Sequence, residues 1–376
     1  GGQHTPLPTY AFQHTRFWPS PATGHGDVTA AGLGRIDHPL LSAVVPLPEA
    51  RGLLLTGRLS TTTHPWLTDH TVLGQVLLPG TAFVEMAVRA GDETGCGTLE
   101  ELTLQAPLVF TGGHPVDVQV LVEDPDPDGR RPVSIHARPD DGTQTHPWQR
   151  HAAGTLTPTR PTGTPSPTPW PPAGARPVPV TDFYPNLAEA GYGYGPVFQG
   201  LTAAWRGDTD VYCEVQLPDP GADPGPFILH PALLDAAVQG VALTGHDTRP
   251  RLPFTWSALT VTTTGARRLR VTLTPQGGDT YTITAADQAG TPVITATLTL
   301  RPLTTEHLTP TTNALWRIDW IDTPPHPDPP TTIAILGPDP HQLGAALRQH
   351  TPHIEPFTDL TALSTATTHP TTILLP

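Results

Sequence analysis

Residues 70–81 read HTVLGQVLLPGT, and the rest of the chain is organised around this stretch. His70 stands four residues before Gly74, and Pro79 follows five residues after that glycine. Helical spacing of apolar residues comes next, at Phe83, Met86, Ala87 and Ala90. Pro79 and Gly80 lie at the helix start, where a missing N–H costs nothing. The pattern predicts a strand or turn with a histidine, a tight glycine turn, and a helix whose free N–H groups point back toward it.

Such an arrangement suits a base that works beside a carbonyl group. The spacing is equally compatible with a polar histidine that merely ends a strand. The remainder of the chain has to distinguish the two interpretations.

Composition excludes several classes of function. The chain has 376 residues, room for two or three domains, and 49 prolines, which suggest packed pieces joined by proline-rich connectors. The net charge of −14 argues against a nucleic-acid partner or an anionic membrane. There is no lysine, which excludes a P-loop lysine and a Schiff-base lysine.

The cysteines and histidines argue against a disulfide framework and a metal site. Cys96 and Cys213 are isolated and form no CxxC motif, so a reduced, cytoplasmic environment is expected. The 18 histidines include no HExxH and no paired spacing typical of a metal site. No apolar run approaches the length of a membrane span. We therefore expect no metal, no bound cofactor and no membrane partner.

Changes in composition divide the chain into five segments. They are a Gly/Pro-rich connector at 1–35, a first block at 36–156, a Pro/Thr-rich linker at 157–177, a second block at 178–305 and a final piece at 306–376. Both blocks predict the same order of strand, helix and antiparallel meander, with the second helix beginning near Pro231. This repetition predicts an internal structural duplication and an α+β fold.

The expected elements can be placed by residue number. In the first block we expect strands at 53–60, 102–110, 116–122, 133–138 and 148–156. In the second block we expect them at 201–206, 211–217, 258–263, 269–274, 281–285 and 293–300. The final piece predicts strands at 315–320, 332–337 and 372–375 with a helix at 342–350, the start of a parallel βαβ unit.

The second predicted helix carries a candidate acid. Asp235 and Gln239 are spaced i, i+4, so their side chains can meet. Flanking Leu, Ala and Val predict burial of Asp235, which would raise its pKa and let it hold a proton at neutral pH. The alternative is a carboxylate facing solvent.

Tyr192 and Tyr194 lie among glycines, where they can present a phenol to a ligand or simply anchor a turn. The spacing of Gly191, Gly193 and Gly195 does not fit a dinucleotide-binding loop.

Taken together, these pieces resemble the dehydratase domain of modular type I polyketide synthases. The family motif HxxxGxxxxP is matched by His70, Gly74 and Pro79, and DxxxQ by Asp235 and Gln239. The motifs GYxYGPxF and LPFxW are matched by Gly191, Tyr192, Tyr194, Gly195, Pro196 and Phe198, and by Leu252, Pro253, Phe254 and Trp256. The flanks agree, since 7–18 resembles the linker after an acyltransferase domain and 315–320 the opening strand of a ketoreductase structural subdomain.

The resemblance implies a double hot-dog fold, in which two long helices are each wrapped by an antiparallel sheet. It also implies a histidine and an aspartate facing each other across a tunnel. The substrate would be a β-hydroxyacyl chain, carried as a thioester on the phosphopantetheine arm of an acyl carrier protein. Acyltransferase and ketoreductase domains would be neighbours, and the domain would form a homodimer.

On this basis each site residue receives an expected role. His70 would remove the α-proton, and Asp235 would protonate the leaving hydroxyl. Gln239, Tyr194 and a backbone N–H near Gly80 would support them, while Gly74, Pro79 and Pro196 would shape the turns. Tunnel walls are expected from Leu78, Tyr192, Phe198, Phe254 and Trp256. Arg267, Arg268 and Arg270 form the densest basic cluster and would dock the carrier protein, although a solvated strand end is the commoner meaning.

Several alternatives stay open at this stage. The same pair of residues can migrate a double bond, or close a cyclic ether after elimination. A hot-dog fold can also serve a thioesterase. A non-catalytic spacer domain is a further possibility, but both reactive residues are present.

Overall fold

The computed structural model divides into two units, residues 1–310 and 311–376. The structure describes residues 28–48, 52–111, 113–142, 146–158, 169–218, 225–245 and 250–303 of the first unit. In the second unit it describes 333–337, 339, 343–348, 353–364 and 372–374. The predicted linker at 1–35 lies largely, and the predicted strand at 315–320 entirely, outside the described residues.

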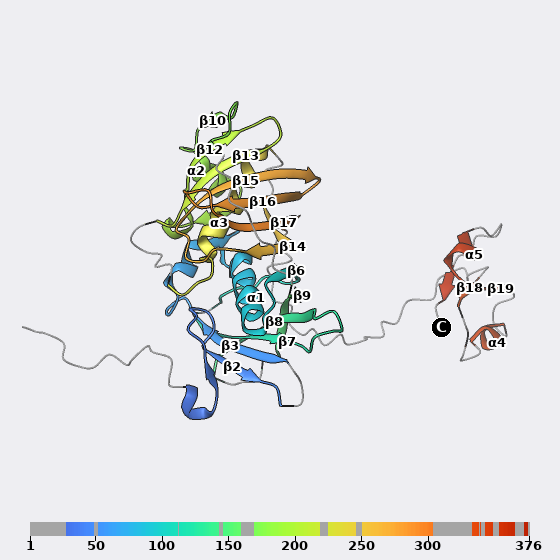
Figure 1. The fold of residues 1–376 in the computed structure, drawn as a ribbon. Coiled ribbons are helices and arrows are strands. Elements are labelled where there is room, and N and C mark those ends of the chain that lie inside the picture. The colour runs from blue at the N-terminus through green and yellow to red at the C-terminus, as the bar shows by residue number, and fades with distance from the viewer. Residues whose placement is uncertain are drawn as a thin grey trace, which may run out of the picture. The chain divides into compact units, whose positions relative to one another are not determined.

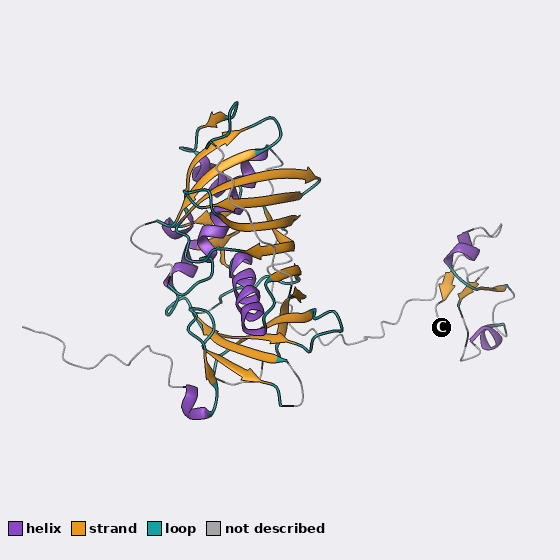
Figure 2. Cartoon of the chain, in the orientation of Figure 1, coloured by secondary structure: helices purple, strands orange, loops and turns teal. Residues whose placement is uncertain are grey.

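One continuous antiparallel sheet of 14 strands forms the framework of the first unit (Figure 2). The first half contributes β1 (Gly34–Arg35), β2 (Ala43–Pro46), β3 (Leu53–Leu59), β6 (Thr98–Leu104), β7 (Val116–Val122), β8 (Arg131–Pro139) and β9 (Gln149–Thr157). The second half contributes β10 (Arg176–Val178), β12 (Leu201–Arg206), β13 (Val211–Gln216), β14 (Arg251–Val261), β15 (Arg268–Gly277), β16 (Thr280–Ala286) and β17 (Pro292–Pro302). The two halves join where β6 pairs with β14, with Leu102 opposite Trp256.

The sheet order confirms the internal duplication. The main strands of the first half run β3-β7-β8-β9-β6, and those of the second run β13-β15-β16-β17-β14. In both halves the chain passes from the first strand through a helix to the strand at the junction, and then builds the other three. This is the arrangement expected of two hot-dog units in tandem.

Each half packs one helix against its strands, and the two helices contact each other near the junction (Figure 1). Helix α1 (Gly80–Thr94) follows Pro79 and ends at Gly95, whose φ of 75° is the left-handed conformation that closes a helix. Phe83, Met86, Ala87 and Ala90 are all buried, as the helical spacing predicts.

The second helix is shorter than expected. Helix α3 (Pro231–Gln239) has nine residues and continues only as the 3₁₀ turn η4 (Gly240–Thr244). Gly240 lies tightly against the second half, since a Cβ there would stand 2.8 Å from both Cys213 Sγ and Leu273 Cδ1. The expectation of two long helices is therefore correct for α1 alone.

Strand predictions hold at most positions, with two clear differences. The predicted strand at 102–110 ends at Leu104, because Gln105 and Ala106 both donate their N–H groups to the carbonyl of His151. Strand β14 begins at Arg251 instead of 258, so the LPFxW motif lies within it. The helix α2 (Phe183–Glu189) was not predicted.

A second, three-stranded sheet carries the opening stretch of the sequence. It consists of β11 (Tyr192–Tyr194), β4 (His70–Val72) and β5 (Gln75–Val76), in that order. The pairing of β11 with β4 sets Tyr194 directly opposite His70, although 124 positions separate the two residues in the sequence (194 − 70). Non-local pairing therefore joins the first and second halves at the site.

Buried polar side chains on α1 connect it to the segment that precedes α3. Glu85 accepts hydrogen bonds from the N–H groups of Ile228 and Leu229 at 2.7 and 3.0 Å. His38 lies 3.1 Å from the same carboxylate. One turn earlier, the hydroxyl of Thr81 donates to the carbonyl of Pro231 at 2.9 Å. These hydrogen bonds fix the start of α3, and therefore the position of Asp235, relative to α1.

The second unit is a small parallel sheet in the order β19-β18-β20. Its elements are β18 (Ile333–Leu336), α4 (Leu343–Leu347), β19 (Ile354–Phe357), α5 (Leu360–Ser364) and β20 (Thr372–Leu374). The parallel pairing confirms the predicted βαβ start. Within the described parts of both units, no helix has the length and apolarity needed to cross a membrane.

Candidate active site

The hairpin between β4 and β5 determines how His70 is presented. Val72 pairs with Gln75 across the two-residue turn Leu73–Gly74, and both turn residues have positive φ, 50° and 76°. Such a turn matches the natural twist of a hairpin and favours glycine at its second position. It returns the carbonyl of Leu77 to within 3.0 Å of His70 Nδ1. Because a carbonyl only accepts hydrogen bonds, Nδ1 carries a proton, and the neutral tautomer that this selects has its lone pair on Nε2.

Aromatic rings hold the imidazole in place. Phe198 lies 5.0 Å from the His70 ring and Tyr194 5.7 Å, measured between ring centroids. His70 is only 4% exposed. The ring is buried and one of its nitrogens is hydrogen-bonded to the backbone, so its orientation is fixed. A polar histidine that merely ended a strand would not need such a fixed orientation.

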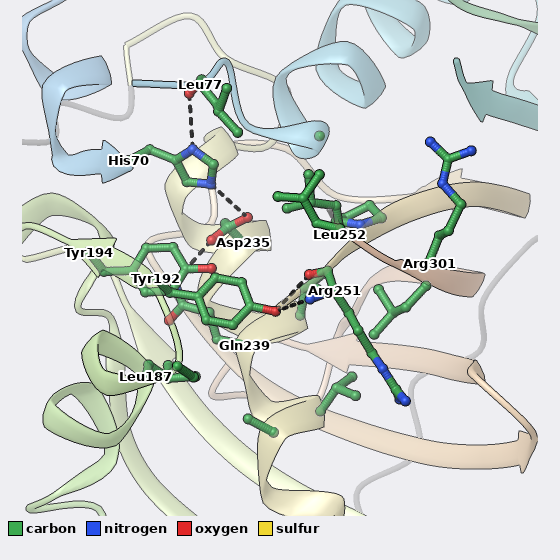
Figure 3. A pocket seen from close by; sticks show the side chains of 18 of the residues that line it. His70, Leu77, Leu187, Tyr192, Tyr194, Asp235, Gln239, Arg251, Leu252 and Arg301 are labelled. Carbon is green, nitrogen blue, oxygen red and sulfur yellow. Dashed lines mark hydrogen bonds and ion pairs between the residues drawn. The ribbon is translucent and has the colours of Figure 1, made fainter. Parts of the chain in front are cut away.

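Asp235 faces this imidazole from the other half of the molecule. Its Oδ1 lies 4.0 Å from His70 Nε2, and Gln239 Nε2 donates to its Oδ2 at 2.9 Å (Figure 3). Asp235 as a whole residue is 4% exposed. Burial raises the pKa of Asp235, while nearby His70 and the hydrogen bond from Gln239 oppose that rise. The prediction of a buried aspartate with a raised pKa is confirmed, and the solvent-facing alternative is wrong.

Both groups open into one cavity of about 310 Å³. Its walls include Leu78, Gly80, Tyr192, Tyr194 and Gln239 among the residues named from the sequence. Further apolar lining comes from Leu77, Phe83, Leu104, Phe183, Leu187, Val238 and Val241. A largely apolar chamber with a few converging polar groups is the usual form of a small-molecule site.

The start of α1 supplies a possible anion contact at the cavity wall. Gly80 is the first helical residue and lines the cavity. Its N–H belongs to the first turn, where no intrahelical acceptor exists and the helix dipole favours negative charge. A Cβ at Gly80 would stand 3.0 Å from Leu104 Cδ1 and 3.1 Å from Pro253 Cβ, so a side chain would crowd this wall.

Three of the predicted tunnel residues do not line this cavity, and the structure corrects them. Phe198 packs on the imidazole of His70 from the 3₁₀ turn η3 (Pro196–Phe198). Trp256 is fully buried in the core. Phe254 lies under the guanidinium of Arg301, 4.6 Å from its ring centroid. Register shifts in β14, one between Pro253 and Thr255, mean that simple alternation does not predict which residues face the cavity.

Pro196 and Pro79 shape the surroundings of the site without lining the cavity. Pro196 opens η3, which is attached to β4 by Asp69, since Val197 N–H donates to Asp69 Oδ2 at 2.9 Å. Gly195 lies so close to Asp69 that a Cβ there would stand 2.5 Å from Cγ. The GYxYGPxF motif is thereby fastened to the residue next to His70.

Two features of the site were missed from the sequence. Helix α2 forms one wall, and its Tyr184 donates a hydrogen bond to Gln239 Oε1 at 3.2 Å. The only sequence signal for α2 was a single apolar pair, Phe183 and Leu187, at i, i+4 spacing around a proline. Arg251 and Arg301 also line the cavity, and Arg251 forms an ion pair with Asp279.

The predicted docking arginines lie elsewhere, and none of them lines the cavity. Arg270 is 3.8 Å from a carboxylate oxygen of Glu214 and 6.0 Å from the ring of Trp170. Arg268 is exposed and Arg267 half-buried. Across the described ranges, no group of three or more His, Cys, Asp or Glu residues is arranged to hold a metal ion.

A histidine and a protonatable aspartate on opposite halves of a double hot-dog fold define a site for acid–base elimination. Comparison with known proteins identifies the family. The model of the polyketide synthase dehydratase domain matches residues 38–138, and that of the polyketide synthase dehydratase N-terminal domain matches residues 162–310. The chain therefore belongs to the dehydratase domains of modular type I polyketide synthases, which are carbon–oxygen lyases.

Similar synthases come from Streptomyces. The polyketide synthase GfsB of Streptomyces halstedii is 48% identical over 336 residues, which is 85% of this chain and 6% of that protein. The pikromycin synthase component PikAII of Streptomyces venezuelae is 44% identical over 99% of this chain and 10% of its own length. The chain thus spans a small part of the synthases that it matches.

Solved dehydratase domains show the same fold over their full length. One, studied for substrate selection in the borrelidin and fluvirucin polyketide synthases, is 48% identical with a TM-score of 0.70, covering 74% of this chain and 100% of its own. The erythromycin dehydratase is 42% identical with a TM-score of 0.69, covering 73% and 100% respectively.

Proposed function

We propose that this chain removes water from a β-hydroxyacyl thioester and yields the α,β-unsaturated thioester. One observation carries the proposal: a histidine with a free Nε2 and a buried carboxyl with a raised pKa meet across 4.0 Å in a single apolar cavity. Elimination needs one group without a proton and one group with a proton. Family membership supports the same reaction.

The elimination follows from the geometry. His70 Nε2 takes the α-proton, and the released electron pair forms the Cα–Cβ double bond. Negative charge on the thioester oxygen is stabilised by the N–H of Gly80 at the start of α1. Asp235 gives its proton to the β-hydroxyl as the Cβ–O bond breaks, and water leaves. The proton now on Nε2 returns to the nearby Asp235 Oδ1, which restores the starting state.

No observation favours the other reactions that the sequence left open. Double-bond migration and cyclic-ether formation use the same two groups, and a thioesterase would release a free acid. The experiment is to incubate the chain with the 3R and 3S epimers of a β-hydroxyacyl-pantetheine thioester and to identify the products by mass spectrometry. We expect an enoyl thioester from one epimer. Release of free acid, or no enoyl product from either epimer, would contradict the proposal.

The phosphopantetheine arm of an acyl carrier protein is the proposed carrier of the substrate, and it requires a basic entrance. Arg301 is suited to this role because it lines the cavity and its guanidinium is held over Phe254. Within the part of the chain that the structure describes, Arg301 has no carboxylate partner, whereas Arg251 and Arg270 do. We place Arg301 ahead of the cluster at 267–270 as the contact for the phosphate or the carrier. A homodimer, acyltransferase and ketoreductase neighbours and a cytoplasmic location remain predictions.

Charge reversal distinguishes these two basic sites. Arg301→Glu should raise KM for a carrier-bound substrate about tenfold, because a like charge at the entrance opposes an anionic partner. The same variant should leave KM for a pantetheine substrate, which has no phosphate, within about twofold. Arg268→Glu is the matched control, an exposed arginine on β15 that lies outside the cavity. A larger effect from Arg268→Glu would return the docking role to the original cluster.

A further inference from the structure

We propose that Tyr184, on α2, is a positioning residue that selects which oxygen of Asp235 carries the acid proton. The inference rests on the proposed function, because it assumes that Asp235 acts as the acid. Tyr184 belongs to none of the recognised sequence motifs and acts only through Gln239. Its hydroxyl lies in a short hydrogen-bond chain that runs from the Leu201 N–H through Gln239 to the carboxyl of Asp235.

The direction of the first two hydrogen bonds is fixed by chemistry. The backbone N–H of Leu201 donates to the phenol oxygen of Tyr184 at 2.8 Å. That oxygen therefore directs its own proton to the other neighbour, Gln239 Oε1, at 3.2 Å. Burial raises the pKa of the Tyr184 phenol well above its ordinary value, so it keeps this proton throughout the range of an activity assay.

The phenol in turn fixes the orientation of the Gln239 amide. With Oε1 facing Tyr184, Nε2 donates to the carbonyl of Phe198 at 3.1 Å and to Asp235 Oδ2 at 2.9 Å. In the opposite orientation the amide oxygen would face the carbonyl of Phe198, which only accepts, and would draw the Asp235 proton to Oδ2, away from His70. At 6% exposure Gln239 has little access to water that would compensate for those lost partners.

The orientation of Gln239 then determines where Asp235 carries its proton. Oδ2 accepts the amide hydrogen bond, so the proton resides on Oδ1. Oδ1 is the oxygen that lies 4.0 Å from His70 Nε2 on the reactive side of the carboxyl group. In the view of Figure 3, His70 lies above Asp235 and Gln239 lies below it. Without Tyr184 the amide can rotate, and the proton is then shared between both oxygens.

Few other titratable groups in the described structure face Asp235. They are His70 on β4, Tyr184 on α2, and Tyr192 and Tyr194 on β11. Burial raises the pKa of all three tyrosines, so none of them ionises near neutral pH. A change in the alkaline limb of the activity profile therefore reports on Asp235.

The test is Tyr184→Phe, which removes the hydroxyl and keeps the ring that packs edge-on against Phe183. We expect kcat to fall about tenfold with KM within about twofold, because the acid is misdirected while substrate binding is intact. The hydrogen bond from the Gln239 amide lowers the pKa of Asp235. Losing that fixed hydrogen bond should therefore raise the pKa of Asp235 and move the alkaline limb of the activity profile to higher pH. An unchanged kcat and pH profile in an active, folded variant would overturn the inference.

Gln239→Leu provides the second variant and a double-mutant cycle. It interrupts the same chain one link further on, so it should shift the alkaline limb in the same direction even if Tyr184→Phe does not fold. Adding Tyr184→Phe to Gln239→Leu should change kcat by less than about twofold, since Tyr184 acts only through Gln239. Additive losses would assign Tyr184 a structural role and refute the proposal. Absence of enoyl product from the wild-type chain would instead refute the proposed function.

Discussion

Replacing His70 by alanine is expected to lower kcat for enoyl formation by about a thousandfold, within the range measured for loss of a general base. Among the described residues, Tyr194, Phe198 and Asp235 surround the imidazole, and burial raises the pKa of the Asp235 carboxyl, which favours its protonated form over a second base. The measurement is the rate of enoyl-thioester formation with the epimer that the wild-type chain accepts. Thermal unfolding in parallel shows whether the variant has kept its fold.

His151→Ala is the matched control for this experiment. His151 is also buried, at 5% exposure, and its Nδ1 likewise hydrogen-bonds a backbone carbonyl, that of Ala106, at 3.0 Å. It stacks on Phe83 behind the cavity wall and has no contact with Asp235. The control therefore removes a buried imidazole and its hydrogen bond while the acid–base pair stays intact. Equal losses in both variants would show that His70 serves packing instead of proton transfer.

Asp235→Asn is expected to lower kcat by about a hundredfold to a thousandfold while the domain stays folded. An asparagine fills the same volume, and its amide oxygen can still accept from Gln239, but it cannot give a proton to the leaving hydroxyl. Asp117→Asn is the control, since Asp117 is half-buried in an ion pair with Arg138 on the far strands β7 and β8. Turnover near the wild-type rate in Asp235→Asn would exclude this residue as the acid.

The same variant tests the pKa of Asp235 through stability. Burial raises the pKa of Asp235 above its reference of 3.8, so above that reference the folded state holds a proton that the unfolded state releases. The free energy of unfolding of the wild-type chain should therefore fall as pH rises from the reference value through the raised folded pKa. Asp235→Asn should flatten this dependence and keep or raise the melting temperature at neutral pH. Activity should be lost over the same rise in pH, as the acid loses its proton.

Much of the site could be predicted because its parts are local. Leu73 and Gly74 form the two-residue turn of a hairpin. That hairpin brings the Leu77 carbonyl to the ring of His70, which lies only seven positions before it in the sequence. Asp235 and Gln239 meet because one helical turn separates them. The apolar spacing after Pro79 makes α1, and alternation makes β7, whose burial alternates along the strand.

The errors share a different physical origin. Phe254 and Trp256 were expected in the tunnel, but irregular pairing of β14 with β17 turns them away from it. Helix α2 is too short and too poor in apolar residues for its periodicity to stand out, and it is stabilised by contacts with β11 and α3 instead. The density of arginines at 267–270 in the sequence suggested a docking site there. The arginines that line the cavity are instead Arg251 and Arg301.

The sequence by itself indicated His70 and Asp235 as the candidate pair, the turn and the helix that carry them, and the duplicated fold. Only the tertiary structure decided that His70 Nε2 and Asp235 Oδ1 stand 4.0 Å apart, that Tyr184 donates a hydrogen bond to Gln239, and that Arg301 lines the cavity. The reason is that hydrogen bonds and side-chain periodicity within one element act over a few residues. The distance between His70 and Asp235 depends instead on contacts between the two halves. These are the pairing of β6 with β14, the pairing of β4 with β11, and the hydrogen bond that Glu85 accepts just before α3. Those contacts join segments that are far apart in the chain, and no local pattern encodes their geometry.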